Sequence, residues 1–313
     1  MRAAFALVVT LFAVAGCGDD DSTGGNDEPS SESPASDQAA VEVDGGPVGI
    51  ADVGGETWTV LPDKGEVRTA DDTRIPVGEA PLRIAATPDG VWVSVIGDGT
   101  VVRIDPATGE IDQTVTLEPA RSEPEGLAWD GAHLWVVDQA NARVVQLAPD
   151  GAEVSSTDVG EGPRLTAAGP SGIWVTNYVE GSLSHIADAQ GSTISLPGCT
   201  GPQGVAELAG KVWVACTVTS SVVALDVESR EVVSTIEEVP DADAVVAHED
   251  TVYVVGQSGP TVYAIDAATG EIRDEVALGD APRTQENVGA AVVGDELVVT
   301  HPDARTIYTV PLP

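Results

Sequence analysis

Short apolar runs recur along the chain at nearly constant spacing. Six of them contain an aromatic residue at corresponding positions, and Val298 takes this position in a seventh run, ELVVTH. The six aromatic residues are Trp58, Trp92, Trp135, Trp174, Trp213 and Tyr253. Successive positions in this column are 34, 43, 39, 39, 40 and 45 residues apart. The pattern therefore predicts seven repeated units of about 40 residues each.

Each unit carries signals for several short strands. An Ala or Val lies seven residues before each aromatic position in a second apolar run, and in the first five units a Pro lies eleven residues before it. A third apolar run follows the aromatic residue, and a turn and a fourth run usually come next. Four short strands in about 40 residues are typical of one propeller blade. We therefore predict an all-β fold, a seven-bladed β-propeller.

One phrase occurs almost twice, as TVVRIDPATGEI at 100–111 and as TVYAIDAATGEI at 261–272. Nine of the twelve positions agree, and the copies lie four periods apart. The side chains of Asp105 and Asp266 can cap a turn, and Gly109 and Gly270 can adopt positive φ. We interpret the phrase as a repeated hairpin turn with a structural role.

The last unit ends after its third strand, while the segment AAVEVDGGP at 39–47 resembles a fourth strand without a unit of its own. We expect this N-terminal strand to pair with the last blade and close the ring, which removes an exposed sheet edge. The aromatic column is expected to pack between neighbouring blades.

The phrases IWVTNYVEGSLSHIADAQG and TVVRIDPATGEI resemble the YVTN-type propeller repeat, and the likeness covers residues 41–313. Such propellers and their relatives include surface-layer proteins, lipoproteins, streptogramin lyases and gluconolactonase-like hydrolases. The resemblance implies the fold but leaves the function open, because one fold supports many activities.

The chain begins with one Arg, an apolar run and small residues ending in Cys17. This order predicts a signal peptide at 1–16, and the segment VAGC resembles the lipobox of bacterial lipoproteins. Residues 17–40 would then be a lipidated Cys17 and a disordered acidic tether. We expect an extracytoplasmic protein that is anchored to the cell membrane, with its propeller at 41–313.

The amino-acid composition limits the classes of molecule that can bind to this protein. Fifty-one acidic residues against 14 basic ones give a net charge of −37, which repels nucleic acids. The remaining cysteines, Cys199 and Cys216, are an even pair in a secreted chain and favour a disulfide. We expect a monomer without a resident cofactor, although a divalent cation stays open as a ligand.

Candidate ligand-binding residues lie where the inner strands begin and the second strands end, since both ends are expected around one mouth of the central channel. Arg283 and Glu286 belong to an insertion, RTQE, in the entry loop of the seventh unit. The full set is Arg83, Glu125, Asp138, Arg164, Asn177, Tyr178, Gln203, Asp243, Gln257, Arg283, Glu286 and His301.

Three functional classes remain open. The first is a binding module for a small molecule, a cell-wall component or a protein, with no catalytic residues. The second is a metal-assisted hydrolase or lyase of the streptogramin lyase or lactonase type at the channel mouth. Its metal is unknown, and its only candidate ligands are Glu125, Asp138, Asp243, Glu286 and His301. The third is a structural spacer in the cell envelope.

Overall fold

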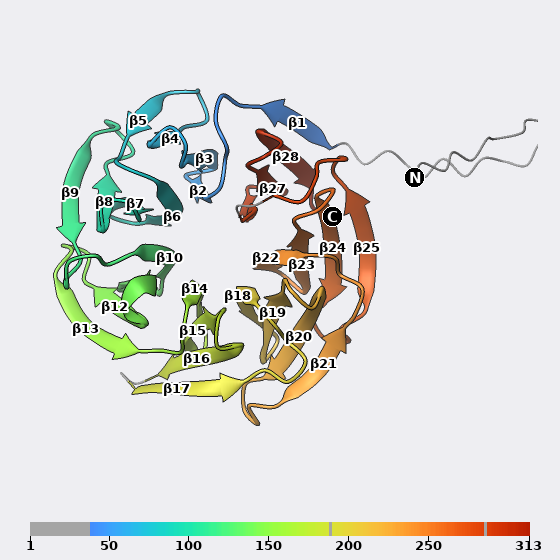
Figure 1. The fold of residues 1–313 in the computed structure, drawn as a ribbon. Coiled ribbons are helices and arrows are strands. Elements are labelled where there is room, and N and C mark those ends of the chain that lie inside the picture. The colour runs from blue at the N-terminus through green and yellow to red at the C-terminus, as the bar shows by residue number, and fades with distance from the viewer. Residues whose placement is uncertain (1–37, 188–189, 285–286) are drawn as a thin grey trace, which may run out of the picture. The chain divides into compact units, whose positions relative to one another are not determined.

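The computed structural model describes residues 38–187, 190–284 and 287–313. Their 28 β-strands form seven antiparallel sheets of four strands each, arranged as a ring around a central channel (Figure 1). One short 3-10 helix, η1 (Gln139–Asn141), follows the second strand of the third blade. The predicted seven-bladed propeller is confirmed. Among the described residues, no helix has the length and hydropathy needed to cross a bilayer.

The strands of each blade run from the channel outward in chain order. Blade 1 contains β2 (Ile50–Val53), β3 (Glu56–Leu61), β4 (Glu66–Arg68) and β5 (Arg74–Pro76). Blade 2 contains β6 (Pro81–Thr87), β7 (Gly90–Val95), β8 (Thr100–Ile104) and β9 (Ile111–Thr116). Blade 3 contains β10 (Pro124–Trp129), β11 (Leu134–Asp138), β12 (Arg143–Leu147) and β13 (Glu153–Asp158).

The next three blades repeat this order. Blade 4 contains β14 (Pro163–Gly169), β15 (Gly172–Asn177), β16 (Ser182–Ala187) and β17 (Gln190–Ser195). Blade 5 contains β18 (Pro202–Leu208), β19 (Lys211–Cys216), β20 (Ser221–Asp226) and β21 (Val232–Ile236). Blade 6 contains β22 (Ala242–His248), β23 (Thr251–Gly256), β24 (Thr261–Asp266) and β25 (Ile272–Ala277).

Blade 7 combines both ends of the described chain. It contains β26 (Gly289–Val293), β27 (Glu296–His301) and β28 (Thr306–Pro311), and its outermost strand is β1 (Ala39–Glu42). β1 runs antiparallel to β28, with Ala39 opposite Thr309 and Glu42 opposite Thr306. The expected closure of the ring by the N-terminal strand is therefore confirmed (Figure 1).

The aromatic column packs between blades, as expected. Trp92 is fully buried and shares an apolar cluster with Leu134 and Val136 of blade 3. Trp213 of blade 5 is likewise buried against Val252 and neighbouring residues of blade 6. A large aromatic residue in each of six units thus fills the space that widens between radiating sheets.

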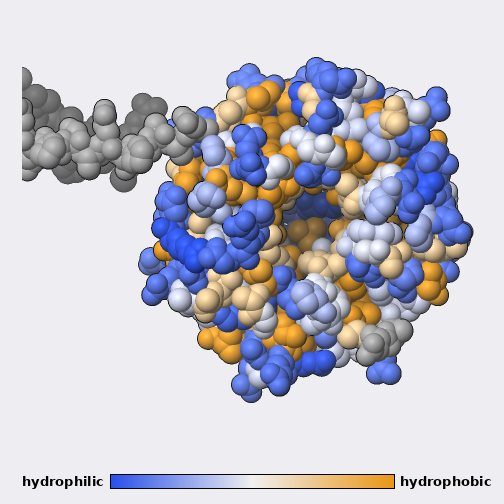
Figure 2. All heavy atoms as spheres, turned by 180° about the vertical axis from the view of Figure 1, so that it is seen from behind, coloured by the Kyte–Doolittle hydropathy of each residue, from blue (hydrophilic) through white to orange (hydrophobic). Residues whose placement is uncertain are grey.

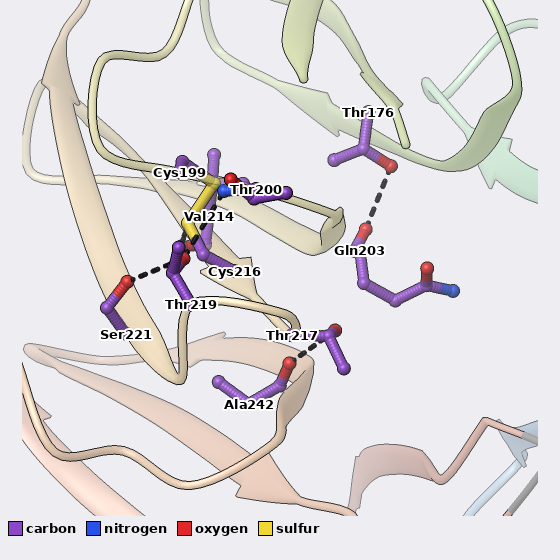
Figure 3. Close-up of a disulfide and its surroundings, with 10 residues drawn as sticks. All are labelled: Thr176, Cys199, Thr200, Gln203, Val214, Cys216, Thr217, Thr219, Ser221 and Ala242. Atoms are coloured by element: carbon purple, nitrogen blue, oxygen red, sulfur yellow. Dashed lines mark hydrogen bonds between the residues drawn. A yellow bond between two sulfur atoms is a disulfide. The ribbon is translucent and has the colours of Figure 1, made fainter. Parts of the chain in front are cut away.

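Buried hydroxyl groups join the inner parts of successive blades. The Thr176 hydroxyl donates to the Gln203 carbonyl oxygen at 2.9 Å, and the Thr217 hydroxyl donates to that of Ala242 at 2.7 Å (Figure 3). The Thr300 hydroxyl donates to the Val48 carbonyl oxygen at 2.7 Å and so links blade 7 to blade 1. These bonds satisfy carbonyl groups at the channel wall.

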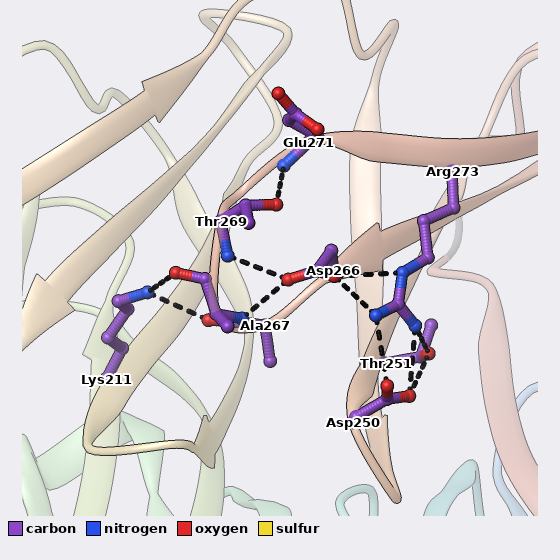
Figure 4. Close-up of polar contacts among 9 residues, drawn as sticks. Lys211, Asp250, Thr251, Asp266, Ala267, Thr269, Glu271 and Arg273 are labelled. Carbon is purple, nitrogen blue, oxygen red and sulfur yellow. Dashed lines mark hydrogen bonds and ion pairs between the residues drawn. The ribbon is translucent and has the colours of Figure 1, made fainter.

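The repeated phrase forms the hairpin that was expected. In blade 6, the Asp266 carboxylate accepts the backbone N–H groups of Ala268 and Thr269, at 2.8 and 2.7 Å, and Gly270 has a φ of 79°. Arg273 bridges Asp266 and Asp250 (Figure 4). Lys211 of blade 5 donates to the carbonyl oxygens of Ala267 and Ala268 of this turn, at 2.8 Å each. The turn is a structural contact between blades 5 and 6.

Candidate functional site

A cavity of about 610 Å³ opens at one mouth of the central channel. The space-filling view shows the ring hollowed at its centre, with hydrophilic residues inside the hollow (Figure 2). The wall of the cavity is built by the starts of inner strands and the ends of second strands, as the sequence predicts. The lining residues are Val48, Leu82, Arg83, Glu125, Arg164, Tyr178, Gln203, Thr217, Gln257, Arg283, Thr284 and Asn287.

A backbone irregularity carries most of the charged residues into this wall. In blades 2 to 6 the inner strand slips register against its neighbour directly after its first residue. The slipped segments contain Arg83, Glu125, Arg164, Gln203 and Asp243. A β-bulge interrupts the alternation of side chains and re-aims them, which is common beside binding sites. The same irregularity therefore presents one polar residue at the cavity in each of blades 2 to 5, whereas Asp243 of blade 6 is buried.

Glu125 and Arg164 form an ion pair across blades 3 and 4. Nη1 of Arg164 lies 3.2 Å from one Glu125 oxygen and 3.5 Å from the other. The Arg164 guanidinium also lies over the Tyr178 ring, 5.5 Å from its centroid. Glu125 is 1% exposed, and this burial raises the pKa of its carboxyl group, while Arg164 and Arg83 act in the opposite direction. The Glu125–Arg164 ion pair is therefore partly shielded from solvent.

Asp243 lies in the wall behind the cavity surface. One of its oxygens accepts the Val288 backbone N–H at 2.7 Å and the Gln257 side-chain amide at 3.1 Å. Its other oxygen is buried without a hydrogen-bond partner. Burial raises the pKa of Asp243 to about 6, opposed chiefly by the positive charge of Arg83.

Two further arginines, Arg83 and Arg283, line the mouth. Arg83 lies near enough to Glu125 and Asp243 to lower the pKa of both, and its Nε is buried without a hydrogen-bond partner. Arg283 donates from Nε to the Gln257 side chain at 3.1 Å and pairs with Asp241 at 3.3 Å. Its side chain is 53% exposed, so it stands at the rim.

Three expected site residues, Asp138, Asn177 and His301, do not line the cavity. Asp138 is buried and accepts hydrogen bonds from Ser122, Asn141, Arg143 and the Glu123 backbone N–H, at 2.8 to 3.0 Å. Its carboxylate organises the loops of blade 3 and does not line the cavity.

Asn177 and His301 are also fully buried and are absent from the cavity lining. The Asn177 amide donates to the hydroxyls of Ser182 and Ser184. His301 contacts the Gln257 carbonyl oxygen through Nε2, at 3.0 Å, and accepts the Ala304 N–H at Nδ1, at 3.1 Å. Both ring nitrogens are therefore used within the fold. Glu286 lies outside the described residues.

Four of the five residues considered for a metal are described by the structure, and these four do not assemble into a metal site. In the described ranges, no three His, Cys, Asp or Glu side chains come together in a way that could hold a metal ion. Glu125 is paired with Arg164, and the nitrogens of His301 are engaged. The donor groups of the described residues therefore do not fit a resident divalent cation.

Cys199 and Cys216 form the expected disulfide, with a Cα–Cα distance of 5.2 Å (Figure 3). Cys216 ends β19 and lies opposite Pro202 in the sheet register. The next residue in each strand, Gln203 and Thr217, lines the cavity. The disulfide therefore braces the part of the mouth that blade 5 supplies.

Several lining residues were not among the candidates from the sequence. Val48 and Leu82 lie in the same inner-strand column as Glu125, and Thr217 ends a second strand like Tyr178. Their positions in the repeat would have been enough to include them among the predicted ligand-binding residues. Thr284 and Asn287 flank the blade 7 insertion. The residues that converge thus include apolar side chains, which the polar candidate set from the sequence left out.

Known proteins were compared with this chain. No protein-family model matches it. The virginiamycin B lyase of Nocardia farcinica is 30% identical over 184 residues, which are 55% of this chain and 63% of the relative. The match therefore spans less than two thirds of that relative's length.

Similar solved structures cover a larger share of this chain than the Nocardia relative does. Virginiamycin B lyase from Staphylococcus aureus has a TM-score of 0.76 at 15% identity and covers 88% of this chain and 99% of its own. A streptogramin B lyase structure has a TM-score of 0.75 at 15% identity, with coverages of 88% and 97%. The designed protein Ika8 has a TM-score of 0.62 at 12% identity, with coverages of 87% and 98%. The expected relation to streptogramin lyase-like propellers is thus confirmed for the fold.

Proposed function

We propose that this protein is a binding module that takes a small molecule at the mouth of its channel. The observation that carries the proposal is the 610 Å³ cavity, to which the inner ends of the blades and the blade 7 entry loop contribute polar side chains. A concave site with a few convergent polar groups is typical of ligand binding. A spacer in the envelope would need no such convergence.

The second candidate is a lyase that acts on a virginiamycin B-like compound, and the Nocardia relative favours it. An elimination needs a base that reaches a substrate proton. Glu125 lines the cavity but is paired with Arg164, and Asp243 is covered, with no exposed surface. The described residues therefore support binding better than proton removal.

One experiment separates the two candidates. The purified full-length chain is incubated with virginiamycin B, and the compound is followed by mass spectrometry while binding is measured by calorimetry on the same sample. We expect binding of small molecules from a polar compound library without conversion of virginiamycin B. Conversion at an enzymatic rate that Glu125→Gln abolishes would establish the lyase instead. No binding from the library would leave only the spacer.

We also propose that lipidated Cys17 holds the propeller outside the cell membrane. The signal-like sequence before Cys17 supports this location, and so does the Cys199–Cys216 disulfide, because disulfides persist in oxidising compartments. Cys17→Ser should move the protein from the membrane fraction to the soluble extracytoplasmic fraction. Unchanged membrane association would contradict the anchor.

A further inference from the structure

We propose that the ligand is an organic anion, a carboxylate that carries an apolar group. The inference rests on the proposed binding function and specifies its ligand class. The carboxylate would lie against Arg83 and Arg164, and the apolar group would lie on the neighbouring rim of blades 4 and 5.

Arginines gather at the mouth of a molecule that has few basic residues. The chain has 51 acidic and 14 basic residues, yet three arginines line this one cavity, where Glu125 is the one acidic residue among the described lining residues. Asp243 adds a second carboxyl group behind the surface, with its pKa raised by burial. The cavity therefore gathers three guanidinium groups in a strongly anionic protein, two of them paired with Glu125 and Asp241, and an anion that enters can compete for these donors.

The arginines retain unused hydrogen-bonding capacity. A guanidinium group has five N–H donors, and Arg164 uses Nη1 for Glu125, while its Nε is buried without a hydrogen-bond partner. The Nε of Arg83 is also buried without one. Buried donors without partners are costly, and a carboxylate that accepts two parallel N–H bonds is the anion that fits a guanidinium best. The polar half of the site thus lacks an acceptor.

The apolar half of the site lies beside these arginines. Val179 and Val218 are 68% and 57% exposed and follow β15 and β19 at the mouth. A Cβ placed on Gly201 would lie 2.8 Å from Val218 and 3.0 Å from the Tyr178 ring, so these two side chains flank the same glycine. We call Tyr178, Val179 and Val218 together the apolar rim.

The apolar rim differs from the other exposed apolar residues. In the described part of the chain, the remaining large exposed ones lie on outermost strands, away from the channel: Val41, Ile111, Val154, Val233 and Ile272. The apolar rim lies beside the channel-mouth cavity, because Tyr178 and Thr217 line that cavity. Arg164 joins the two halves, because its guanidinium lies over Tyr178. A ligand with an anionic end and an apolar body matches this arrangement.

Glu125 acts in this arrangement as an internal competitor. It occupies Nη1 of Arg164 when no ligand is bound, and its charge opposes an incoming carboxylate. Removing the charge with Glu125→Gln should therefore strengthen anion binding several-fold, while glutamine keeps a polar side chain in the lining. A role of Glu125 as a ligand-binding group predicts the opposite sign.

The test uses three probes of the same shape: phenylbutyrate, phenylbutanol and phenylbutylamine. Each is titrated into the full-length chain by calorimetry, and the Arg Nε–H signals are followed by NMR. We expect phenylbutyrate to bind with a dissociation constant on the order of 1 mM, as fits a compound of this size. The alcohol and the amine should bind at least about tenfold more weakly, because they lack the charge-assisted bonds.

Substitutions of the arginines test whether phenylbutyrate binds at this site. Relative to Glu125→Gln, the double variant Glu125→Gln/Arg164→Gln should weaken phenylbutyrate binding about tenfold, because the single variant keeps the Arg164 charge and the double variant removes it. Arg83→Gln should weaken it similarly. Arg230→Gly removes one positive charge from an outer hairpin, at a φ of 59° that suits glycine, and should leave affinity unchanged.

Three results would overturn the inference: stronger binding of the amine than of the carboxylate, weaker phenylbutyrate binding in Glu125→Gln, or equal affinity with and without Arg164. Binding of the alcohol or the amine at the mouth with an affinity equal to or higher than that of phenylbutyrate would preserve the proposed function while rejecting the anion. Binding of none of the probes would also reject the anion, and the compound library described above would then decide the proposed function by itself.

Discussion

At the scale of single residues, Asp243 and Asp266 show how environment sets the behaviour of one side-chain type. Burial raises the pKa of Asp243 to about 6, whereas hydrogen bonds from the Thr269 backbone and from Arg273 lower that of Asp266 to about 2. The native state therefore holds a proton on Asp243 at a pH where the unfolded chain has lost it. The stabilisation that comes from this proton on Asp243 is a contribution to the free energy of unfolding, and it falls as the pH rises from about 4 to about 6.

We predict that Asp243→Asn flattens part of this pH dependence. The free energy of unfolding of the wild type minus that of the variant should decrease from pH 4 to pH 6, with a slope of at most about 1.4 kcal/mol per pH unit. Urea titrations at several pH values measure it. The groups around Asp243 are Arg83, Arg283, Gln257, Glu125 and the Val288 N–H, and the four side chains are left unchanged.

Asp266→Asn is the matched control for this experiment. Because its pKa is already near 2, Asp266 stays ionised in the native state over the same range, and its favourable contribution is lost only at lower pH. The difference between wild type and Asp266→Asn should be nearly constant from pH 4 to pH 6, apart from a small rise near the pKa of the unfolded Asp. A similar falling slope in both variants would mean that the general acidity of the molecule, and not the burial of Asp243, causes the effect.

Residue positions in the repeat predicted part of the site but not the direction of each side chain. Glu125 and His301 both lie at strand ends near the channel, yet only Glu125 reaches the cavity. Glu125 lies in a bulged segment, while His301 contacts Gln257 and Ala304 within the fold. A bulge and a local hydrogen bond depend on atoms from neighbouring blades, and a single apolar pattern does not encode them.

At the scale of elements, the disulfide fixes the entry of β18 beside the end of β19. It closes a loop with a sequence separation of 17 residues. Chain-entropy arguments give roughly 3 kcal/mol for a loop of this size, through restriction of the unfolded state. We predict that Cys199→Ser/Cys216→Ser lowers the free energy of unfolding by about this amount, as measured by urea titration.

The same variant tests whether the disulfide shapes the mouth. Gln203 and Thr217 follow Pro202 and Cys216 directly and are also held by bonds to Thr176 and Ala242. We therefore expect phenylbutyrate affinity to change little while stability falls. Reduction of the wild type with dithiothreitol is the control and should reproduce the loss. An unchanged stability in both cases would show that the unfolded chain is not restricted by this bond.

At the scale of the whole molecule, the seven-fold pattern determines both the ring and its central site. The aromatic period predicted the number of blades, because each blade repeats the same inter-blade packing, and the unmatched strand at 39–42 predicted the closure. The cavity follows from this arrangement, since the inner strands of the blades begin around one mouth. Its chemistry does not follow, because the repeat specifies the positions around the mouth and leaves the residue at each one free.

The net charge of −37 leads to a prediction for the entire fold. Even if each of the 14 basic residues compensates one acidic residue, 37 negative charges remain uncompensated, so repulsion among carboxylates outweighs the ion pairs that salt would weaken. The compact state concentrates this charge, and screening should favour it. We expect the free energy of unfolding to rise by about 1 kcal/mol or more between low salt and about 0.5 M NaCl, with Tm rising roughly 2 °C or more. Thermal melts in NaCl and KCl measure it, with sucrose as the uncharged control, and a fall in Tm with either salt would show that the ion pairs dominate.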